Sequence, residues 1–86
     1  MAPEIDFDGN TVWVNDDTGC CIGRLGRLGV DVHKTGPQQM LGGSQCLDCH
    51  SPPIEQMWDY FKNSMLAHHS VEIPEAAKPL WAIIAP

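Results

Sequence analysis

Apolar and polar residues alternate near the start of the chain with the period of two that is typical of strands. Ile5 and Phe7 alternate with acidic residues, and residues 11–15 are rich in β-branched and aromatic side chains. The intervening Asp8-Gly9-Asn10 is a strong turn signal, because all three residue types tolerate tight backbone geometry. We therefore predict a β-hairpin in this part of the chain.

The strand pattern continues through a glycine-rich segment. Residues 20–25 and 30–34 predict two further strands, joined by a turn at Gly26-Arg27-Leu28-Gly29. The glycines of residues 23–29 recur every three positions, which is not the spacing of a dinucleotide-binding fingerprint. We expect a twisted or bulged hairpin here. A loop that cradles an anion, helped by Arg24 and Arg27, is the alternative.

A helical period follows residue 51. Apolar and aromatic side chains recur on one helical face, together with one histidine, at Ile54, Met57, Trp58, Phe61, Met65 and His68. Ser51 suits the N-cap and Pro52 the first helical position, so we predict an amphipathic helix over 52–69. Prolines then break the helical pattern, and residues 70–86 are predicted to be an extended tail that wraps the domain or adds an edge strand.

These elements predict an α+β fold in one small domain. An antiparallel β-meander of three to four strands spans 4–34, a loop with a cysteine knuckle spans 35–50, and the helix packs across the sheet. A chain of 86 residues builds a core that offsets its conformational entropy only narrowly. We therefore expect a metal, a disulfide or a partner to contribute to stability.

Charge narrows the classes of partner. Eleven acidic residues against five basic ones give a net charge of −6, and residues 1–17 hold five acids and no base. Repulsion from phosphate argues against non-specific nucleic-acid binding, and the longest apolar run is too short for a membrane span. We expect a protein partner with a basic docking surface, with self-association through the apolar C-terminal tail as a further expectation.

The first residues show neither the basic nor the apolar region of a secretion signal, so we expect a cytoplasmic protein. Structural disulfides are disfavoured in that compartment, and clustered cysteines then indicate metal binding or reactive chemistry.

Cys46-x-x-Cys49 places two sulfur atoms on one tight knuckle, which resembles a degenerate zinc knuckle. Zinc takes four ligands, commonly cysteine and histidine. The histidines at the end of the predicted helix lie roughly 24 Å along its axis from its start, too far to join them. The other two ligands are expected to be one of Cys20 or Cys21 and one of His33 or His50.

The segment Cys46-Leu47-Asp48-Cys49-His50 also resembles the attachment motif of c-type cytochromes. The resemblance implies thioether bonds from Cys46 and Cys49 to haem, with His50 as an axial ligand and Met40, Met57 or Met65 in the sixth position. A dithiol redox role is a further alternative, because Cys49 lies close to the predicted helix start. Reduced core cysteines without any such role are another.

The function predicted from these observations is that of a small acidic binding, adaptor or inhibitor module stapled by zinc. No residues suggest a complete catalytic constellation, so enzymatic activity is not expected. A redox protein that uses Cys46, Cys49 and His50, with haem or as a dithiol, is the alternative.

Overall fold

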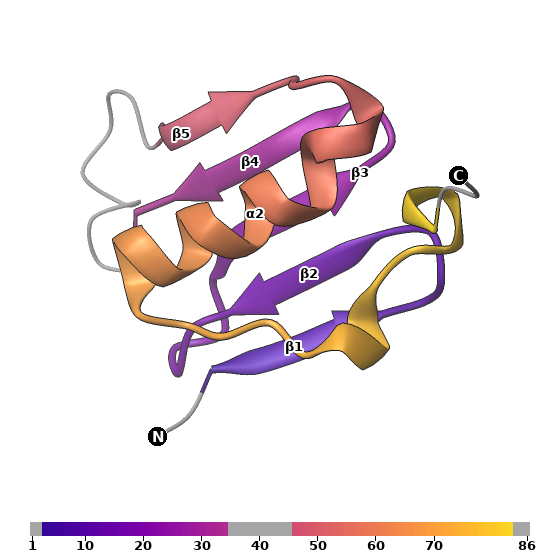
Figure 1. Cartoon of the computed structure of the whole chain (residues 1–86). Coiled ribbons are helices and arrows are strands. Elements are labelled where there is room, and N and C mark those ends of the chain that lie inside the picture. Colours follow the sequence, from indigo (N-terminus) through magenta and orange to yellow (C-terminus); the bar gives the residue numbers. More distant parts are fainter. Residues whose placement is uncertain (1–2, 35–45, 84–86) are drawn as a thin grey trace.

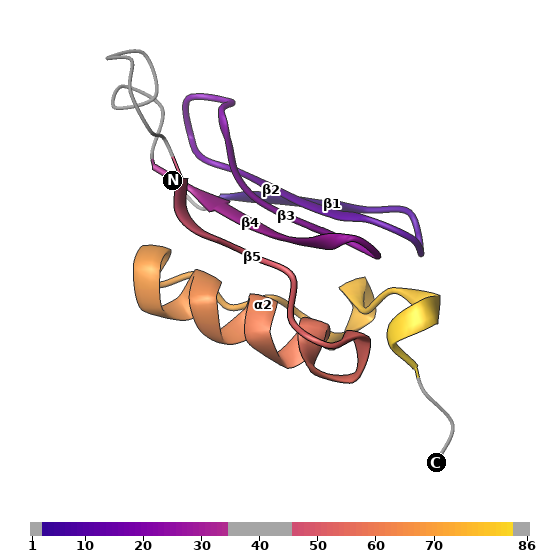
Figure 2. The ribbon, with the colours of Figure 1, turned by 90° about the horizontal axis from the view of Figure 1, so that it is seen from above.

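The computed structural model describes residues 3–34 and 46–83 as an α+β fold, a five-stranded antiparallel sheet packed against one helix (Figure 1). The strands lie side by side in sequence order: β1 Glu4–Phe7, β2 Val12–Asn15, β3 Cys21–Gly26, β4 Gly29–His33 and β5 Cys46–His50. Helix α2, Ile54–His69, crosses one face of the sheet. Among the described residues, no helix or strand covers the opposite face (Figure 2).

The predicted fold class is confirmed, and so is the meander over residues 4–34. The prediction of a loop over the cysteine knuckle was wrong, because Cys46–His50 forms the edge strand β5 and pairs with β4. The backbone of β4 forms ladder hydrogen bonds with this segment, and a local sequence pattern does not predict such pairing. Residues 35–45 of the predicted loop lie outside the described part of the chain.

The helix begins later than its capping pattern predicts. Its N-cap is Pro53, and the Ser51 hydroxyl donates a hydrogen bond to the Leu28 carbonyl at 2.9 Å instead of capping the helix. The predicted N-cap was wrong because a residue that precedes a proline avoids the helical conformation. Pro52 precedes Pro53, so the helix starts only after both prolines. The helix ends at His69, and the C-cap residue Ser70 adopts the left-handed conformation with φ of 57°.

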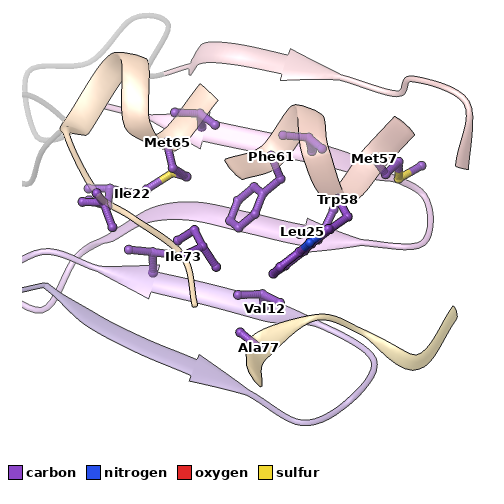
Figure 3. Packing of buried hydrophobic residues seen from close by; sticks show 13 residues of the cluster. Val12, Ile22, Leu25, Met57, Trp58, Phe61, Met65, Ile73 and Ala77 are labelled. Carbon is purple, nitrogen blue, oxygen red and sulfur yellow. The ribbon is translucent and has the colours of Figure 1, made fainter. Parts of the chain in front are cut away.

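The core lies between α2 and the inner face of the sheet (Figure 3). Phe61 and Met65 are fully buried on the helix, and they face buried strand residues such as Val12 and Leu25. A Cβ atom built on Gly23 would lie 2.5 Å from the Met65 sulfur. A glycine on β3 therefore lets the helix pack directly against the strand backbone.

The described part of the C-terminal segment, residues 70–83, wraps the rest of the same face and forms no strand. Its short 3₁₀ turns, η1 Glu75–Ala77 and η2 Leu80–Ala82, lie on the helix side of the sheet, near β1 and β2 (Figure 2). The Trp81 indole donates to the Asn10 carbonyl at 2.7 Å, and the Leu80 amide donates to the Gly9 carbonyl at 2.8 Å. These bonds tie the tail to the β1–β2 turn.

A polar cluster anchors the helix to the edge strand. Asp48 of β5 accepts hydrogen bonds from the Tyr60 hydroxyl at 2.8 Å and from the buried Ser64 hydroxyl at 2.8 Å. The bond from Tyr60 to the Asp48 carboxylate, with a smaller effect of desolvation, raises the pKa of Tyr60 above its usual value of 10.0. The folded state therefore holds the Tyr60 proton more tightly than the unfolded state does.

This anchor predicts an alkaline loss of stability. Its contribution is complete below the usual tyrosine pKa, and is lost as the pH rises through the higher pKa of the folded state. Urea unfolding of wild type and Tyr60→Phe across the alkaline range measures the effect. We expect the unfolding midpoint of wild type to fall more steeply with pH. Equal slopes in the two proteins would contradict the assignment.

Candidate metal centre

The outer face of the sheet, opposite α2, carries the groups that can bind a metal. Cross-strand pairing aligns Trp13 with Arg24, Arg24 with Asp31, and Asp31 with Cys49. Residues paired directly across a ladder project to the same face. The valines on either side of Asp31 are buried in the core. Since side chains alternate along a strand, Asp31 projects away from the helix.

A bulge at the start of β5 brings both knuckle cysteines to that outer face. In a regular strand, residues three apart project to opposite faces. Here the register shifts between Val32 and His33, so that Cys46 lies opposite His33 while Cys49 lies opposite Asp31. The extra residue of a bulge restores both cysteines to one face.

The two cysteines form a disulfide, with Cα atoms 6.0 Å apart. The sequence favours reduced cysteines at this position, and the structure differs from that expectation. The bulge explains the difference, because it places the two Cβ atoms on the same side of the strand. Cys20 and Cys21 are not disulfide-bonded.

Asp31, His33 and Cys49 form a potential metal-binding group. One ligand atom from each lies within 4.8 Å of the other two, and Asp31 and His33 are half-buried while Cys49 is exposed. Donor atoms around a tetrahedral zinc lie roughly 3.3–3.8 Å apart, given bond lengths of about 2.0–2.3 Å. Once the Cys46–Cys49 disulfide is reduced, small side-chain movements would bring the three ligand atoms to these separations. The disulfide adds the Cys46 sulfur next to that of Cys49.

The other predicted ligands lie elsewhere. The His50 ring centroid lies 5.1 Å from that of Tyr60 on α2, so His50 projects toward the helix and away from the metal-binding group. The Cys20 amide donates to the Asp16 carboxylate at 3.0 Å, within the β2–β3 turn. Cys21 pairs with Asn15 at the start of β3. Among the described residues, the potential metal-binding group does not include His50, Cys20 or Cys21.

Asp31 is the member of this potential metal-binding group that was not predicted from the sequence. The sequence feature that could have identified Asp31 is the Asp-x-His spacing within a strand, because residues two apart project to the same face. Arg24 lies 3.7 Å from the Asp31 carboxylate, and both side chains are substantially exposed. Exposed pairs of this kind contribute about 1 kcal/mol or less, so Arg24 does not prevent Asp31 from binding a metal.

None of the helices in the described residues has the length and apolar character needed to cross a bilayer. Comparison of the chain with protein-family models, with curated proteins and with solved structures finds no match.

Proposed function

We propose that the chain is a small acidic binding module whose edge strand is held by zinc when its cysteines are reduced. The ligands would be Asp31, His33, Cys46 and Cys49. The observation that carries this proposal is the convergence of Asp31, His33 and Cys49 on one face, with ligand atoms within 4.8 Å. Three of these four residues belong to the set that the sequence predicts.

The donor set favours a structural role for the metal. Two thiolates, an imidazole and a carboxylate fill the tetrahedral coordination of zinc and leave no position for a water molecule. Catalytic zinc sites keep such a position open. A zinc ion whose four ligands all come from the protein therefore argues for a structural site and against hydrolytic chemistry.

The bound zinc ion would connect β4 to β5. Both pairs of ligands, His33 with Cys46 and Asp31 with Cys49, are cross-strand partners. An ion bound by all four would hold the edge strand in register, and its binding energy would add to folding energy. The disulfide excludes this state, because zinc binds thiolates. A cytoplasmic location would favour the reduced form.

The binding role is supported by the charge of the opposite edge. β1 is an edge strand, and its exposed Glu4 and Asp6 are followed by exposed Asp8. A basic surface on a partner protein, as an adaptor or inhibitor would use, complements this strand. Self-association through the tail stays a prediction. It is consistent with the exposure of Leu80 and Ile83, at 73% and 62%.

Zinc competition against a chromophoric chelator tests the ligand set. Reduced wild type is expected to bind one zinc ion, and His33→Asn or Cys49→Ser to weaken binding by about tenfold or more. Cys20→Ser is the matched control, since it also removes a thiol but lies outside the proposed site. Loss of zinc in Cys20→Ser with retention in His33→Asn would contradict the proposal.

The disulfide supports a second candidate function, that of a dithiol redox protein. Interconversion of Cys46 and Cys49 between dithiol and disulfide exchanges two electrons and two protons with a thiol partner. Equilibration with glutathione buffers, followed by thiol counting, measures the potential. A reduction potential of the Cys46–Cys49 pair that lies within the range of the cellular glutathione potential would favour this function. Complete reduction of the pair throughout that range would argue against it. The haem alternative gains no such support, because His50 packs on Tyr60.

A further inference from the structure

A hollow of about 660 Å³ lies where the β3–β4 hairpin meets the end of β5 and the β1–β2 turn. Its lining includes Trp13, Arg24, Arg27, Asn10, Asp31 and Ser51. Pockets for small ligands commonly measure about 300–1,000 Å³, so the hollow is large enough for a small molecule.

The charge of this hollow is opposite to that of the chain. The protein carries a net charge of −6 and has only two arginines, Arg24 and Arg27, and both line the hollow. The Asp31 carboxylate is the acidic group in the lining, and it lies 3.7 Å from Arg24. Arg27, in the turn between β3 and β4, is exposed and forms no ion pair among those found in the described residues.

The side chains favour a ligand with two chemical parts. Guanidinium groups match phosphate oxygens in a bidentate geometry, which a lysine cannot reproduce. Trp13 lies directly across the ladder from Arg24 and offers a large aromatic surface beside it. Planar rings bind such surfaces by stacking. Asn10 and Ser51 add polar groups at the rim.

We propose that this hollow binds a small phosphate-bearing ligand with a planar ring, of the mononucleotide class. The arginines would hold the phosphate, and Trp13 would contact the ring. The proposal does not require zinc, since the hollow is present in the disulfide form, although Asp31 and Cys49 belong both to its lining and to the proposed metal site. It also agrees with the expected absence of non-specific nucleic-acid binding, because the two arginines of this acidic chain both lie at one hollow.

Titration of the isotope-labelled, oxidised full chain with AMP, followed by amide chemical shifts, tests this assignment. We expect saturable shifts at residues 10–13 and 24–31. Adenosine and inorganic phosphate, titrated separately, are each expected to bind about tenfold more weakly, because each keeps half of the contacts.

Arg24→Gln with Arg27→Gln is expected to weaken AMP binding by about tenfold or more. The matched control is Lys62→Gln with Lys78→Gln, which removes the same charge from residues outside the hollow and is expected to leave binding unchanged. Trp13→Leu, checked for folding by circular dichroism, is expected to reduce AMP affinity to that of inorganic phosphate.

Three results would overturn the proposal. One is the absence of saturable shifts up to about 10 mM AMP, beyond the weak-binding range of about 1 mM. Another is equal AMP affinity in the arginine and lysine double variants. The third is binding of an oligoglutamate peptide at the same amides without binding of AMP, which would assign the hollow to an acidic protein segment.

Discussion

Replacing Phe61 with alanine is expected to lower the free energy of unfolding by about 3–5 kcal/mol. Phe61 is fully buried at the centre of α2 and projects onto the inner face of the sheet (Figure 3). Its removal leaves a cavity between helix and sheet that the neighbouring strands fill only in part. Domains are stable by about 5–15 kcal/mol, so this one side chain accounts for a large share of the total.

Urea unfolding of the oxidised protein measures this loss, and Leu66→Ala is the matched control. Leu66 lies on the same helix but is 50% exposed, so its truncation is expected to change stability by about 0.5 kcal/mol or less. Equal destabilisation by the two substitutions would show that α2 does not pack on the sheet through its Phe61 face.

Saturating zinc is expected to raise the midpoint of thermal unfolding of the reduced protein by roughly 16–33 °C. A ligand at about 1,000 times its dissociation constant stabilises the folded state by about 4.1 kcal/mol. In a domain of this size each kcal/mol shifts the midpoint by about 4–8 °C. The effect is large because the metal joins two strands of a chain with a small core.

Three proteins control this experiment. Cys20→Ser keeps the proposed ligands and is expected to show the full zinc-dependent rise. Cys49→Ser and the oxidised wild type are expected to show little or none, since a substituted or disulfide-bonded sulfur is lost as a thiolate ligand. A rise of similar size in the oxidised wild type would place the metal elsewhere in the chain.

The regular elements of the fold were predictable because their patterns are local. Alternation around Ile5, the turn at Gly9 and the stripe that contains Phe61 each identify an element within a short window. Strand β5 was not predictable in this way. Its five residues include two cysteines, an aspartate and a histidine, and its stability as a strand comes from pairing with β4, which lies more than ten residues away.

The candidate site was predictable in residue type and not in geometry. The spacing of Cys46 and Cys49 indicated a shared ion, whereas the structure joins them in a disulfide. His33 was among the alternatives. Asp31 was missed, because its role depends on pairing with β5 and on the bulge that turns both cysteines outward. The choice between His33 and His50 likewise required the strand alternation that places them on opposite faces.

The most direct test of the zinc proposal is the mass of the reduced protein, measured under native and then denaturing conditions after incubation with zinc and dialysis. The proposal predicts a native mass increment of one zinc ion that disappears on denaturation and is absent from Cys49→Ser. A native mass equal to that of the bare chain, with all four cysteines present as thiols, would contradict it.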